Sequence, residues 1–176
     1  MELVFSKDSE RTYSTIAMRE DGVILKIKGP DRPLRLPHDL AHFVVESEFN
    51  LKFGFWGKIA AGVVFPGIEI LAGRRKPHAA DRAKAVQAQA GQQGIQAEVL
   101  VEVMIEIAEK ELPVEAAQKL LKESWKPSKG AKGEFSAEEI SSVCRRLKEA
   151  ENQWMVLPVG DTMKVDWGNQ LSRKRQ

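Results

Sequence analysis

The sequence changes from a strand pattern to a helix pattern within the stretch Val23-Ile24-Leu25-Lys26-Ile27-Lys28-Gly29-Pro30-Asp31-Arg32-Pro33-Leu34-Arg35-Leu36-Pro37-His38-Asp39-Leu40-Ala41-His42-Phe43-Val44-Val45-Glu46. In its first six residues Val23, Leu25 and Ile27 alternate with a mostly polar set, which predicts a strand with one buried face. Glycine and prolines then interrupt the pattern. Pro37 suits the first position of a helix, and Asp39 suits the positive end of the helix dipole. The stretch therefore predicts a strand followed by a helix from about Pro37 to Phe49.

Further strands are expected at both ends of the chain. Asp21-Gly22 is a hairpin signal between the second and third N-terminal strands, and Val159-Gly160-Asp161 joins a second predicted hairpin. The predicted strands are Leu3–Phe5, Thr12–Met18, Val23–Lys28, Trp154–Leu157 and Thr162–Trp167. Strands at both ends around a helical middle predict an α+β fold, with an antiparallel sheet from the N-terminal strands and a C-terminal hairpin packed against four to six helices.

The middle of the chain reads as a series of helices. We expect a short helix bounded by glycines within 55–62, a polar exposed helix, an apolar helix, one opened by Pro113, and one with a clear N-terminal signal. The last four have the expected ranges Ala79–Ala90, Gln96–Lys110, Pro113–Ser124 and Ala137 to about Asn152. Ser136 and Glu139 form a predicted capping box, with Phe135 and Ile140 as the hydrophobic staple.

Length and composition favour one domain over residues 1–176, with a flexible loop at about 126–134 and a disordered tail at about 169–176. A net charge of +2 without a concentrated basic patch makes nucleic acid an unlikely partner. The most apolar window, Phe53–Ala72, contains Lys58, Pro66 and Glu69, so we expect it in the core and not in a membrane. A single cysteine, Cys144, indicates a reducing compartment and predicts a cytoplasmic protein.

Two of the three histidines lie four residues apart on the predicted helix Pro37–Phe49. His38, His42 and Glu46 share one helical face, and the spacing matches the two-histidine half of the zinc-protease helix motif. The residue after the first histidine, which acts as base in that motif, is here the shorter Asp39. This pattern predicts a divalent metal such as zinc on His38, His42 and Glu46, with Asp39 as the candidate catalytic base. Other candidates for the third ligand are His78 and the glutamates that recur every four residues, Glu98, Glu102 and Glu106.

A structural interpretation accounts for the same residues. A buried histidine pair can be satisfied by backbone carbonyls and neighbouring carboxylates, and Asp39 can serve only as a helix-start charge. The glutamates can form a narrow wet stripe on an otherwise buried helix. Gly54, Gly57 and Gly62 would let a backbone pass close to the histidine helix, as in a tight core or beside a small pocket.

The run Leu36-Pro37-His38-Asp39-Leu40-Ala41-His42-Phe43-Val44-Val45-Glu46, followed by Gly54-Phe55-Trp56-Gly57 and Ala60-Ala61-Gly62, resembles a family of small bacterial proteins. That family carries LPHDxxHFxVE and then GxxGxxAxG, and it is uncharacterised. The resemblance implies a bacterial, cytosolic origin and no particular activity.

Two functional hypotheses follow. The first is a non-enzymatic binding or regulatory protein, with a protein partner and a histidine pair in its core. The second is a metal-dependent hydrolase-like protein that uses the HDxxHxxxE helix.

Overall fold

The computed structural model describes residues 1–32, 35–74, 77–91, 93–126 and 133–168. Five strands form one sheet in the order β4-β3-β2-β1-β5, and every neighbouring pair is antiparallel. The strands are β1 (Glu2–Lys7), β2 (Tyr13–Met18), β3 (Ile24–Lys28), β4 (Glu69–Ala72) and β5 (Thr162–Asp166). The helices are α1 (His38–Phe49), α2 (Phe55–Ala60), α3 (Ala79–Ala90), α4 (Gln93–Glu109), α5 (Val114–Ser124) and α6 (Ala137–Val156). The predicted α+β class with an antiparallel sheet is confirmed.

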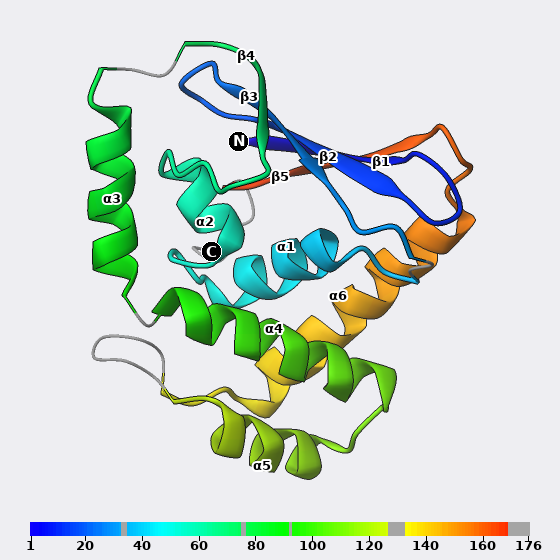
Figure 1. The fold of residues 1–176 in the computed structure, drawn as a ribbon. Helices are drawn as coiled ribbons and strands as arrows, with labels where there is room; N and C mark the ends of the chain where they lie inside the picture. Colours follow the sequence, from blue (N-terminus) through cyan, green and yellow to red (C-terminus); the bar gives the residue numbers. More distant parts are fainter. Residues whose placement is uncertain (33–34, 75–76, 92, 127–132, 169–176) are drawn as a thin grey trace.

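Helices α1, α2, α4 and α5 lie in successive layers on one side of the sheet, and α3 stands beside these layers (Figure 1). Helices α1 and α2 lie directly under the sheet, α4 lies beneath α1, and α5 is farthest from the strands, while α6 crosses from the α5 end up to the sheet (Figure 1). Phe5 of β1 packs edge-on against Trp56 of α2, with ring centroids 6.0 Å apart. Tyr13 of β2 meets Trp154 of α6 at the same distance. These aromatic contacts join the sheet to the helical layer that carries the histidines.

Helix α1 begins at His38, one residue after its expected start at Pro37, and ends at Phe49 as expected. Pro37 occupies the N-cap position, and Asn50 ends the helix in the left-handed conformation, with φ of 54°. Buried residues lie around most of its circumference: Leu40, Ala41, His42, Phe43, Val44, Val45, Glu46 and Phe49. Because α1 is enclosed by α2, α4, α6 and the sheet, its polar side chains must find partners inside the protein.

The predicted start of α6 is confirmed. The Ser136 hydroxyl accepts a hydrogen bond from the Glu139 N–H, and the Glu139 carboxylate accepts one from the Ser136 N–H. Phe135 and Ile140 are both buried. The helix, however, continues to Val156, four residues beyond its expected end.

That extension corrects the predicted C-terminal hairpin. Residues 154–156, expected in a strand, form the last turn of α6, so the C-terminal part contributes only β5 to the sheet. The physical reason is that the buried positions Val143, Leu147, Ala150 and Trp154 continue the helical spacing of three to four residues.

Part of the window expected in the core is exposed. Trp56 and Ile59 are buried, but Glu69–Ala72 forms the edge strand β4, whose four residues are all exposed. The expected loop at 126–134 lies mostly outside the described residues, and the expected tail at 169–176 lies wholly outside them.

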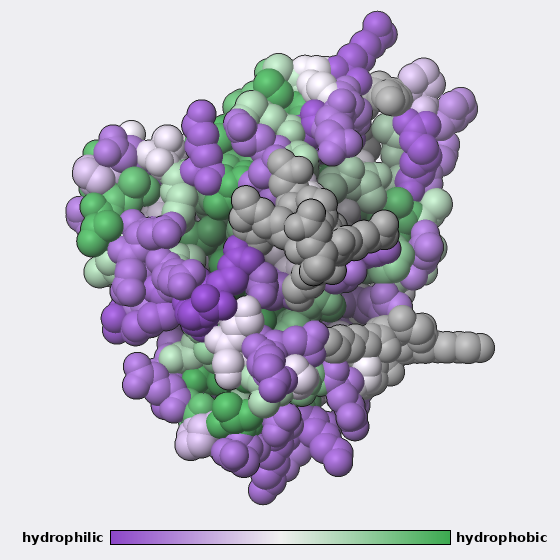
Figure 2. All heavy atoms as spheres, turned by 180° about the vertical axis from the view of Figure 1, so that it is seen from behind, coloured by the Kyte–Doolittle hydropathy of each residue, from purple (hydrophilic) through white to green (hydrophobic). Residues whose placement is uncertain are grey.

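Hydrophilic side chains cover most of the described surface seen from the reverse side of the molecule (Figure 2). Among the described residues, no helix combines the length and the apolar character needed to cross a lipid bilayer.

A candidate metal centre between two helices

Helix α1 places His38, His42 and Glu46 on one face, as the four-residue spacing predicts. The imidazoles of His38 and His42 meet edge-on, with ring centroids 4.7 Å apart. Burial deepens along the helix: the side chain of His38 is one-third exposed, that of His42 is 4% exposed, and Glu46 is fully enclosed. The face therefore runs from a solvent-accessible end into the core.

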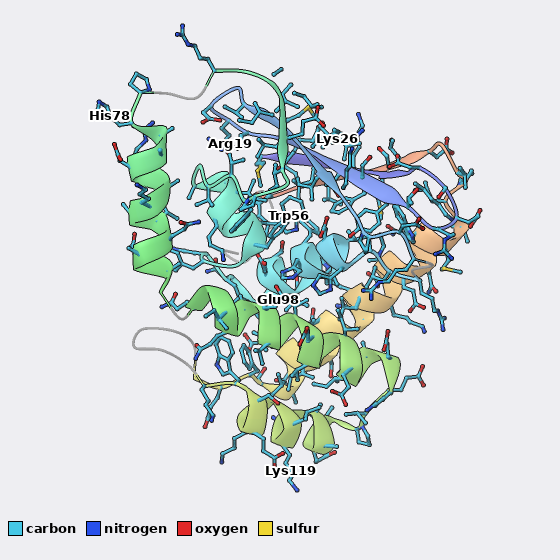
Figure 3. The ribbon with its side chains drawn as sticks, viewed as in Figure 1. Arg19, Lys26, Trp56, His78, Glu98 and Lys119 are labelled. Atoms are coloured by element: carbon cyan, nitrogen blue, oxygen red, sulfur yellow. The ribbon has the colours of Figure 1, made fainter. Side chains whose placement is uncertain are left out.

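Glu98 of α4 completes the cluster from the opposite side. Its Oε1 lies 2.9 Å from Nε2 of His38, and its Oε2 lies 3.2 Å from Nε2 of His42. The two histidine Nε2 atoms are 3.1 Å apart. Glu98 lies between α1 and α4 (Figure 3), so packing of these two helices brings three ligand-type side chains to one point.

Glu46 faces the other edge of the His42 ring. Its Oε1 lies 2.8 Å from His42 Nδ1 and also accepts a hydrogen bond from the Phe55 N–H, while its Oε2 accepts one from the Trp56 N–H at 3.0 Å. Acceptance of two backbone N–H groups indicates an ionised carboxylate, so Nδ1 of His42 is the donor in their contact. This assignment directs Nε2 of His42 toward His38 and Glu98.

Gly54 allows this arrangement because it has no side chain. A Cβ atom at this position would lie 2.2 Å from Cδ of Glu46. The expectation that a glycine lets the following segment approach the histidine helix is therefore confirmed at Gly54. The adjacent start of α2 then supplies the two N–H groups that hold Glu46.

The hydrogen bonds in the cluster favour the protonated form of His42 and the ionised form of Glu98. Burial lowers the pKa of His42, but its hydrogen bonds to Glu46 and Glu98 outweigh burial and raise the pKa to about 9. The hydrogen bonds of Glu98 to His38 and His42 hold the pKa of Glu98 well below its usual range. The site thus stabilises a positive charge between two carboxylates.

Asp39, the predicted base, occupies a different environment. Its side chain lies beside Tyr13 of β2, and burial raises its pKa despite the nearby histidines. Among the described residues, its Oδ2 atom has no hydrogen-bond partner, nor has the hydroxyl of Tyr13. Asp39 is thus a partly buried carboxyl whose charge acts on the nearby cluster, and its role as a base stays a prediction.

The remaining ligand candidates lie apart from the cluster. Glu106 pairs with Lys110, which lies just past the end of α4, and Glu102 is exposed. His78 precedes α3 and is far from Glu98 in Figure 3; its partner is Asp81. The helical repeat of the glutamates marked three equivalent positions, and only the packing of α4 against α1 selects Glu98.

No family model matches this chain, and neither a curated protein nor a solved structure is similar to it at a significant level.

Proposed function

We propose that this protein binds a divalent metal ion, zinc by ligand type, through His38 Nε2, His42 Nε2 and the Glu98 carboxylate. The observation that carries the proposal is the convergence of these atoms, with separations of 2.9, 3.1 and 3.2 Å. In a tetrahedral zinc site with bonds of about 2.0–2.1 Å, two ligand atoms lie about 3.3 Å apart. A zinc ion would therefore require only small outward movements of the three side chains.

Glu46 takes a supporting role in this proposal, not the ligand role predicted from the sequence. Metal-bound histidines usually donate their second ring N–H to a carboxylate, which fixes the tautomer and the ring orientation. Glu46 stands in that position toward His42, and its own two backbone hydrogen bonds fix it in turn. These hydrogen bonds behind His42 support a preorganised metal site and not an accidental cluster of polar groups.

The site supports binding better than hydrolysis. Three protein ligands leave a fourth position for water, and the exposed fractions of His38 and Glu98, 33% and 50%, give solvent access to it. A hydrolase also needs a base that reaches this water, and Asp39 is not among the described residues whose ligand atoms converge at the site. We therefore propose a non-enzymatic metal-binding protein of the bacterial cytosol, with metal-dependent hydrolysis as the alternative.

The direct test is metal content and affinity. Purified protein, stripped with a chelator and reloaded, is expected to hold one zinc ion per chain by elemental analysis, and zinc should raise the unfolding temperature. His42→Gln and Glu98→Gln should each lose the bound zinc.

The chain offers a matched control for each variant. His78→Gln changes the third histidine, which lies away from the cluster, and Glu102→Gln changes the exposed glutamate one turn beyond Glu98. Both controls should bind zinc as the wild type does. Zinc binding that survives in His42→Gln, or that is lost equally in the controls, would refute the assignment.

A further inference from the structure

A cavity of about 310 Å³ opens beside His38, where the segment before α1 meets α4 and α6. Its apolar wall consists of Leu36, Ile105 of α4 and Leu147 of α6. The volume is at the lower end of the range of small-molecule sites. Of the eight described lining residues three are apolar, and the other five, His38 among them, are charged or polar. None of the three apolar residues belongs to the proposed metal site.

Four charged residues also line the cavity, and two of them are already paired. Nε of Arg35 lies 2.7 Å from Oε1 of Glu151, and Nζ of Lys148 lies 3.4 Å from the other oxygen of that carboxylate. Glu151 is thus neutralised by its neighbours. An incoming ligand would have to break the Arg35 pair to use either group.

Arg32 and Glu109 are the other two charged lining residues, and within the described part of the chain neither has an ion-pair partner. The backbone N–H of Arg32 is fixed by the carbonyls of Arg11 and Pro30. Arg32 is exposed, so its guanidinium can pair with a ligand that enters the cavity. Glu109 is the last residue of α4 and is exposed.

We infer that this cavity binds a small monocarboxylate with an aliphatic body, its carboxylate on Arg32 and its carbons against Leu36, Ile105 and Leu147. A guanidinium pairs a planar carboxylate through two parallel hydrogen bonds. A dianion such as phosphate fits less well than a monocarboxylate, because the carboxylate of Glu109, which has no ion-pair partner among the described residues, lines the same cavity. The inference goes beyond the proposed metal site and does not require it, since Arg32 and the apolar wall hold the ligand alone.

The test uses three six-carbon probes, hexanoate, hexanol and hexylamine, titrated into chelator-treated protein at pH 7 and followed by NMR shifts of the backbone amides. Hexanoate should bind and shift the amides of Leu36, Ile105 and Leu147. Hexanol should bind at least about tenfold more weakly, because a charged hydrogen-bonded pair contributes about 1.5–3 kcal/mol more than no pair. Hexylamine should bind more weakly still.

Two arginine variants test whether Arg32 is the residue that pairs with the carboxylate of hexanoate. Arg32→Gln should weaken hexanoate binding about tenfold or more and leave hexanol binding unchanged. Arg145→Gln, an exposed arginine of α6 outside the cavity, is the matched control and should change neither. Equal binding of hexanol and hexanoate, tighter binding of hexylamine, or an unaffected Arg32→Gln would overturn the inference.

Repeating the titration with zinc separates this inference from the proposed function. Hexanoate binding with and without zinc supports the Arg32 site, even if the protein proves to hold no metal. Hexanoate binding only in the zinc-loaded protein would overturn it, because the metal would then be the group that holds the carboxylate.

Discussion

Glu46 holds Nδ1 of His42 at 2.8 Å while its two oxygens accept hydrogen bonds from the N–H groups of Phe55 and Trp56. One buried carboxylate thus connects the histidine helix to the start of α2. The orientation of the His42 ring therefore depends on the hydrogen bonds that hold Glu46 in place.

Glu46→Gln should weaken zinc binding by about 10- to 100-fold, as is typical when the partner of a metal-bound histidine is changed. The amide group of glutamine would turn a donor toward a backbone N–H or toward His42, so the free energy of unfolding should also fall, by about 1–3 kcal/mol. Competition with a zinc chelator measures the first effect and chemical denaturation the second. Glu102→Gln is the control, and an unchanged zinc affinity in Glu46→Gln would contradict the supporting role of Glu46.

Gly54→Ala should disturb the same carboxylate without changing any ionisable group. The added methyl carbon would lie 2.2 Å from Cδ of Glu46, so either Glu46 or the start of α2 must move. Overpacking of this kind costs about 1–3 kcal/mol, which thermal or chemical unfolding detects. Zinc affinity should fall with stability.

Gly133→Ala is the matched control for this substitution, because a Cβ atom there meets nothing within 4 Å. If Gly54→Ala were as stable as this control and bound zinc normally, the close approach of Gly54 to Glu46 would contribute neither to stability nor to zinc affinity.

Sequence reasoning succeeded where the signal is local. The four-residue spacing placed His38, His42 and Glu46 on one face, and the Ser136 capping box fixed the start of α6. Both depend only on helix geometry and on side chains within one turn.

Prediction from the sequence failed where contacts between distant parts of the chain determine the structure. Trp154 has a high strand preference, but its contact with Tyr13 and its place in the buried face of α6 keep it helical. The choice of Glu98 among three equivalent glutamates depends on how α4 packs on α1. The role of Glu46 depends on a turn that brings Phe55 and Trp56 back to it, and no spacing along α1 encodes that turn.

Asp39→Asn should raise the unfolding temperature at pH 7. Burial raises the pKa of Asp39 in spite of the attraction of His42 and His38, so the ionised form costs stability in the folded state. An asparagine amide carries no charge and can donate a hydrogen bond to the neighbouring Tyr13 hydroxyl oxygen. The gain should shrink as the pH falls and the wild-type carboxyl becomes protonated.

Asp161→Asn, an exposed aspartate in the turn before β5, is the control and should leave the unfolding temperature nearly unchanged. A lower unfolding temperature for Asp39→Asn at pH 7 would mean that the attraction between Asp39 and the histidines outweighs burial. Unaltered zinc content in Asp39→Asn is expected in either case, because Asp39 is not among the converging ligands.

The metal-free protein should lose stability as the pH rises from about 6.5 to about 9. The pKa of His42 is near 6.5 in the unfolded chain and about 9 in the folded one, so the folded state binds the extra proton in this interval. The stabilisation is therefore complete below the unfolded pKa and is lost as the pH passes the folded pKa. The groups that face His42 are His38, Glu46, Glu98 and Asp39, and the carboxylate of Glu98, with its lowered pKa, stays ionised throughout.

Unfolding of chelator-treated protein, measured at several pH values, tests this directly, with His42→Gln as the variant that should lack the slope and His78→Gln as the one that should keep it. Zinc replaces the proton on Nε2 of His42 in the proposed site, so zinc-loaded protein should show a much flatter profile over the same interval. A wild-type profile that is flat without metal, or that rises toward pH 9, would mean that His42 is neutral in the folded protein, and zinc binding near pH 7 would then release no proton from this ring.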